Sequence, residues 1–118
     1  MYGLKDGLDL SFLKDSEVVQ VAIGIYQIQF AFRGDAVLSV ESRFVYESNG
    51  EATEWKPGTN KAATAAVNLL GAMVAEIKTP DQKTLELFFS NGDLLRVFDD
   101  SKEYESFTIT RPGVTIVV

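Results

Sequence analysis

Carboxylates gather most densely toward the end of this 118-residue chain, at Asp93, Asp99, Asp100, Glu103 and Glu105. Oxygen ligands brought together by a turn and a helix start could hold Ca²⁺ or Mg²⁺. A metal- or carboxylate-dependent hydrolase would then use the three aspartates. However, the segment lacks the Asp-x-Asp-x-Asp-Gly loop of an EF-hand, and aspartate favours turns and helix starts for local reasons alone. We therefore predict that Asp93 belongs to a hairpin, that Asp99 and Asp100 cap a helix, and that no metal is bound.

Two further polar patterns could support chemistry. Glu41 and Glu86 could act as a glycosidase pair, but both fall on outward positions of expected strands, where no pocket would raise the pKa of a catalytic acid. Ser42 falls on the apolar face of its strand, between Val40 and Phe44. A buried serine usually bonds to nearby backbone, and the alternative is a polar group inside a small cavity.

Trp55 is the one tryptophan, and it lies in the least regular segment of the sequence. An exposed tryptophan is a good anchor for a protein interface. The alternative is that it pins its loop to the core. We select Trp55 as the candidate binding residue, because loops carry function more often than scaffolds do.

The composition excludes several classes of chemistry. The chain has no histidine and no cysteine, which removes the commonest general base, thiolate zinc sites and cysteine nucleophiles. A net charge of −6 argues against nucleic acid, because the phosphates would be repelled. With 46% hydrophobic residues, the chain is expected to form a single folded domain over residues 1–118, without a cofactor and without enzymatic activity.

The hydrophobic pattern predicts an α+β domain, mostly antiparallel sheet with one main helix. A capped turn is expected at 9–13, a helix from Thr59 or Asn60 to about Leu70, and a short helix from Asp99 or Asp100 through Tyr104. Two three-stranded meanders and a final hairpin should supply the sheet. Their strands are expected at residues 17–24, 26–32, 36–47, 72–78, 84–89, 94–98, 107–109 and 114–118.

Alternation assigns a buried face to each strand. Tyr26, Ile28, Phe30 and Phe32 share one face, and the second meander is expected to bury Met73, Ala75 and Ile77. Val19, Val21 and Ile23 follow the same period, and Asn91-Gly92 predicts a type I′ hairpin turn. The two meanders share a Gly-Asp turn before their last strand, at 34–35 and 92–93, which suggests an internal duplication. The alternative is that all meanders share this pattern.

The segment Val114–Val118 contains no charged side chain. On a sheet edge it would invite pairing with another chain, and we keep a homodimer as one hypothesis and a buried closing strand as the other. No signal peptide is recognisable at the start, and the longest uncharged stretch is too short to cross a bilayer. The expected location is the cytoplasm, away from membranes.

The sequence also resembles a known family. The motif runs from Ser90-Asn91-Gly92-Asp93 through Asp99-Asp100-Ser101 to Tyr104-Glu105-Ser106-Phe107-Thr108-Ile109, with earlier matches at 23–30 and 40–44. Together these segments resemble a family of small, mostly bacterial proteins known only as a domain of unknown function. The resemblance covers most of the chain and implies a fold unit, without an activity.

The function expected from the sequence is that of a non-catalytic binding or protein-interaction module. One specific form is an acidic inhibitor or immunity-type protein that masks a basic partner, helped by electrostatic steering. The alternative is a small-ligand carrier, whose apolar pocket would be lined by Phe30, Phe32, Phe44 and Leu87. The carboxylate- or metal-dependent hydrolase is the third hypothesis.

Overall fold

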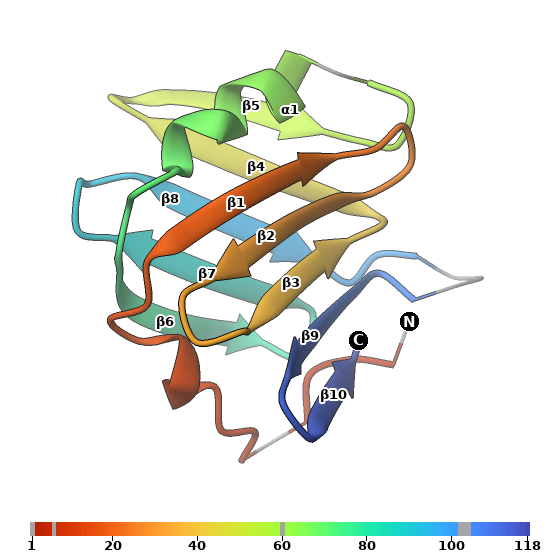
Figure 1. The fold of residues 1–118 in the computed structure, drawn as a ribbon. Coiled ribbons are helices and arrows are strands. Elements are labelled where there is room, and N and C mark those ends of the chain that lie inside the picture. Colours follow the sequence, from red (N-terminus) through yellow and green to blue (C-terminus); the bar gives the residue numbers. More distant parts are fainter. Residues whose placement is uncertain (1, 6, 60, 102–104) are drawn as a thin grey trace.

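Two five-stranded antiparallel sheets form the body of the protein in the computed structural model, which describes residues 2–5, 7–59, 61–101 and 105–118. The first sheet has the order β1-β2-β3-β9-β10, and the second has the order β5-β4-β8-β7-β6. In Figure 1 the first sheet lies in front of the second. The bounds are β1 Val18–Ile23, β2 Ile28–Phe32, β3 Val37–Val40, β4 Arg43–Ser48, β5 Glu51–Trp55, β6 Val74–Asp81, β7 Thr84–Phe89, β8 Leu94–Phe98, β9 Phe107–Arg111 and β10 Val114–Val117.

The core lies between the two sheets. Phe30 of β2 meets Phe44 of β4 edge to face, with ring centroids 5.8 Å apart, so side chains of both sheets interdigitate. Ile28, Phe30 and Phe32 are buried as their alternation predicts. Tyr26 was wrongly placed on that face, because it belongs to the turn before β2 and is 71% exposed.

The strand expected over residues 36–47 is two strands. β3 belongs to the first sheet and β4 to the second, and the chain crosses between them at Glu41 and Ser42. Both backbone amides donate to the carbonyl oxygen of Ser106, at 3.0 and 3.1 Å. The period-2 pattern continues through this crossing because both strands face the same core, and for that reason the sequence does not reveal the break.

The segment that looked irregular contains β5. Asn49 and Gly50 both have positive φ, 53° and 82°, and close a tight turn that pairs β5 with β4. Because β5 is an edge strand with Glu51 and Glu54 exposed, it lacks the apolar run that identifies an inner strand.

The main helix is shorter than expected. α1 spans Lys61–Ala66 and continues as the 3₁₀ helix η2 over Val67–Leu69. Gly71 ends this segment with φ 84°, as predicted for the stop. Ala63 and Ala66 are fully buried, and α1 packs on β5 and β4, which confirms that the small alanines allow close contact with a sheet.

A second 3₁₀ helix, η1 (Ser11–Leu13), confirms the expected capped turn, because Asp9 Oδ1 accepts from the Ser11 amide at 2.9 Å. The helix expected from Asp99 or Asp100 through Tyr104 falls largely outside the described residues. Within the described part of the chain, no helix is both long and apolar enough to span a membrane.

Two edge strands bury different residues from those predicted. In β1, Val18 is buried while Val19 and Ile23 are about half exposed, and at β6 the first residue, Val74, is buried while Met73 just before it is exposed. The register shifts at Val18/Gln20 and at Val74/Glu76, so a bulge moves the alternation by one position in each strand. Val21 and Ile77, which lie beyond the bulges, pack against the core as predicted.

The 91–92 turn also differs from the prediction. Gly92 has φ 93°, but Asn91 does not have the positive φ that a type I′ turn requires. The Phe89 amide donates to the Asp93 carbonyl at 2.9 Å, which closes a three-residue loop.

Candidate interaction site

The aspartates of the acidic group have separate structural partners. Asp93 is buried and accepts from the Tyr46 hydroxyl at 2.6 Å and from Asn91 Nδ2 at 3.3 Å. Asp99 is also buried, and it accepts from the Gly3 amide at 2.7 Å and from the Ser106 hydroxyl at 2.6 Å. Among the described residues, no three acidic side chains lie close enough together to hold a metal ion. Asp93 thus has the hairpin role predicted for it.

Asp100 is hydrogen-bonded to the segment where the chain crosses from one sheet to the other. Its carboxylate accepts from Ser42 Oγ at 2.6 Å and from Arg43 Nε at 2.7 Å. Burial alone would raise the pKa of Asp100, but the hydrogen bonds from Ser42 and Arg43 lower it below its ordinary value. The buried hydroxyl of Ser42 therefore bonds to a side chain, whereas the sequence indicated the backbone.

Arg43 also binds Glu54 at 3.0 Å, and its guanidinium lies 3.9 Å from the Phe98 ring centroid. Glu86 lies in β7, and with Glu47 it binds Arg96, at 2.7 and 2.6 Å. Glu41 accepts from Gln27 Nε2 at 3.2 Å. Glu41 and Glu86, which are not expected to act as a glycosidase pair, have separate partners, with Glu41 in the crossing after β3 and Glu86 in β7.

Trp55 does not lie on the surface. Its side chain is fully buried and stacks on Phe44, with ring centroids 5.4 Å apart and an interplanar angle of 18°. Its indole nitrogen has no hydrogen-bond partner among the described residues. A surface contact needs an exposed ring, so the geometry corresponds to the alternative interpretation, in which Trp55 holds its segment against the core.

The residues expected to line a carrier pocket pack against one another. Phe30 and Phe44 are in ring contact. Each of the four residues expected to line this pocket has at most 2% of its surface exposed. None of them lines any of the five cavities described for the molecule, which lie along its surface loops and edges. The four residues are Phe30, Phe32, Phe44 and Leu87.

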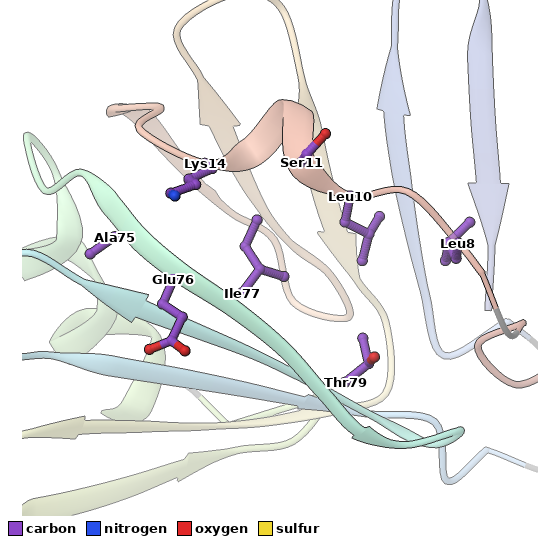
Figure 2. Close-up of a pocket in the computed structure, with 8 residues that line it drawn as sticks. All are labelled: Leu8, Leu10, Ser11, Lys14, Ala75, Glu76, Ile77 and Thr79. Atoms are coloured by element: carbon purple, nitrogen blue, oxygen red, sulfur yellow. The ribbon is translucent and has the colours of Figure 1, made fainter.

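A groove of about 350 Å³ runs between β6 and the segment that contains η1. Leu8, Leu10 and Ile77 provide its apolar lining, and Ser11, Lys14 and Thr79 lie along it (Figure 2). Glu76 also lines the groove, and its carboxylate lies 3.7 Å from Lys78 Nζ. The lining is therefore mainly apolar, with one cation, Lys14, and a single acid, Glu76, so it does not hold a pair of converging acids.

Among the described residues, the two most exposed large apolar side chains lie in the turn between β1 and β2, next to Ile23 at the end of β1; Figure 1 shows this turn as a projecting loop beside the segment that follows β5. Ile23 is 49% exposed, and Ile25 and Tyr26 are each 71% exposed. We call these three residues the hairpin apex. A hollow of about 310 Å³ adjoins them, lined by Ile23, Gly24, Ile25, Gly58 and Thr59.

Backbone hydrogen bonds hold the hairpin apex in place. The Gly24 amide donates to the Gln27 carbonyl at 2.8 Å, and the Gly58 amide donates to the Ile25 carbonyl at 2.8 Å. The apolar side chains are therefore presented on a backbone that is fixed at both sides of the turn. A group of exposed apolar side chains that lie together is a candidate contact site.

Residues 9–118 match the model of a family of unknown function, DUF6188. The chain belongs to this family. The resemblance to an uncharacterised domain family is thereby confirmed. No curated protein and no solved structure matches the DUF6188 chain.

Sequence reasoning missed the hairpin apex of this DUF6188 domain because it extended the alternation of β2 backward through Tyr26. Gly24 indicates a bend or turn in the sequence, but the alternation gives no sign that this turn extends through Tyr26. For the carboxyl-terminal strand two alternatives were open, and β10 lies at the edge of its sheet, which is the position from which pairing with another chain is expected.

Proposed function

We propose that this DUF6188 domain is a non-catalytic module that binds another protein through the hairpin apex. The observation that carries the proposal is the exposure of Ile25 and Tyr26, 71% each, on a hydrogen-bonded turn. Tyrosine is among the residues that most often dominate binding energy at interfaces, provided that the partner offers a pocket for its ring.

The charge of the chain indicates the chemistry of the partner. A net charge of −6 attracts a basic protein at long range, and the apolar apex then supplies the contact. An acidic inhibitor or immunity-type protein is the more specific form of this proposal. Three aspartates that could suggest hydrolysis have structural partners, which supports binding rather than catalysis.

The test is capture from native lysate with matched variants. Ile25→Ser/Tyr26→Ser removes the apex, and Tyr2→Ser is the control, because Tyr2 is 59% exposed at a distant point of the chain. We expect a protein that is retained by the wild type and by Tyr2→Ser, is lost with the double variant, and is released by raised salt. No retained protein, or equal retention by all three proteins, would contradict the proposal.

A further inference from the structure

Four strands form the outer edges of the two sheets, and three of them are protected. β1 carries a bulge at Val18/Gln20, and its Val18 backbone bonds to residues 71 and 72. β5 is packed against α1. β6 carries two register shifts as well as Glu76, Lys78 and Pro80. Bulges, charges, proline and covering helices are the usual devices that prevent an edge strand from pairing with another chain.

β10 carries no bulge, charged side chain, proline or packed helix among its described residues, although the amino-terminal segment lies beside it. It pairs with β9 through four consecutive positions without a register shift, and its sequence is Val-Thr-Ile-Val. Val114 and Val117 are 38% and 39% exposed. A cavity of about 180 Å³ lies between β10 and the amino-terminal residues Gly3, Lys5 and Leu8. The edge is therefore not packed tightly against the segment beside it.

The hydrogen bonds at the end of the strand determine which backbone groups face outward. Val118 and Phe107 bond to each other in both directions, at 2.9 and 3.4 Å. Bonded and non-bonded pairs alternate in an antiparallel ladder, so Ile116 faces β9 while the amide and carbonyl groups of Thr115 and Val117 point away from it. Within the described chain, no backbone hydrogen bond from another segment reaches Thr115 or Val117.

A second copy fits this edge because an antiparallel strand pair is self-complementary and the surface around β10 is neutral. Each chain carries −6, so two copies repel each other except where the surface is neutral. The outward positions of β3, β9 and β10 are all uncharged: Val37, Ser39, Thr108, Thr110, Thr115 and Val117. The outer face of the other sheet instead carries the ion pairs of Arg43 and Arg96.

We propose that β10 pairs antiparallel with β10 of a second copy across a two-fold axis at Ile116. Thr115 then lies opposite Val117 of the partner subunit, and the four outward backbone groups on each strand form four intermolecular hydrogen bonds. An antiparallel strand pair is self-complementary, as a two-fold interface requires. Because one short strand pair is a small contact, we expect a reversible dimer with a dissociation constant on the order of micromolar. This inference does not depend on the hairpin apex.

Sedimentation velocity over a concentration series tests the dimer. We expect the wild type to shift from monomer to dimer as concentration rises, and Val117→Lys to weaken the dimer at least about tenfold, because an edge lysine blocks pairing. Adding Thr115→Glu to Val117→Lys should restore the dimer, since each lysine then faces a glutamate of the other copy.

Gln20→Lys is the matched control, because it places the same charge on the exposed edge strand of the same sheet. It should dimerise as the wild type does. Unchanged thermal unfolding of each variant at concentrations where all are monomeric verifies that the fold is intact. A wild type that stays monomeric throughout, or a Val117→Lys variant that dimerises equally well, would overturn the proposal.

Discussion

Individual polar residues in this protein serve the fold through specific partners. The Tyr46 hydroxyl bonds to Asp93 inside the structure, and burial together with the Asp93 carboxylate raises the pKa of the tyrosine. Ser42, Arg43 and Asp100 connect the crossing between the sheets to the end of β8. The residue types were evident from the sequence, but their partners lie 47 to 58 positions away and could not be identified without the fold.

Tyr46→Phe removes one donor from a buried carboxylate. We expect it to lower the free energy of unfolding by about 1–3 kcal/mol, because Asp93 keeps only part of its hydrogen bonding. Urea unfolding at neutral pH measures this loss. Tyr2→Phe, at an exposed position, should change the stability by less than about 0.5 kcal/mol. Equal effects of the two changes would show that the buried bond contributes nothing.

Asp100→Asn should lower stability in a pH-dependent way. The folded state lowers the pKa of Asp100 below 3.8, so its stabilising effect is complete above that pH and is lost as pH falls through the lowered pKa. The stability difference between the wild type and the variant should therefore shrink as pH decreases from about 7 to about 2. Urea unfolding across this range measures it, with Asp35→Asn at an exposed turn as control. A difference that is independent of pH would contradict the assignment.

At the scale of elements, alternation predicted most strands, and its errors share physical causes. Bulges shifted the buried positions of β1 and β6. The apolar alternation continued unbroken from β3 into β4 because both strands face one core. β5 escaped detection because its core-facing side carries Glu51 and Thr53 before Trp55 and so shows no apolar alternation, and Trp55 was taken for a loop residue. The apolar alternation of an inner strand is visible in a sequence. The order of the strands in a sheet is not.

Trp55→Ala tests whether β5 is fixed by its tryptophan. We expect a loss of about 3–5 kcal/mol in the free energy of unfolding, because a fully buried ring that stacks on Phe44 is removed. Thermal and urea unfolding measure the change. Glu51→Ala, exposed on the same strand, should cost less than about 0.5 kcal/mol. A tryptophan variant as stable as that control would show that Trp55 does not hold the strand.

At the scale of the whole molecule, the fold separates three kinds of surface. The outer face of the second sheet carries ion pairs, and the outer face of the first sheet is uncharged over β3, β9 and β10. The turn between β1 and β2 is apolar. Composition alone supplied the net charge and the lack of histidine and cysteine, and hence the expectation of binding rather than catalysis. Composition could not predict where the exposed apolar side chains lie. Their position depends on which apolar residues fall in the turn and are therefore not buried in the core.

The most direct test of the binding role is calorimetric titration of a captured, purified partner with three forms of this protein. We expect Ile25→Ser/Tyr26→Ser to weaken binding at least about 30-fold, which corresponds to about 2 kcal/mol, while Tyr2→Ser binds as the wild type does. Raised salt should weaken the binding of the wild type and of Tyr2→Ser alike. Equal affinity of the double variant and the wild type would contradict the assignment of binding to the hairpin apex.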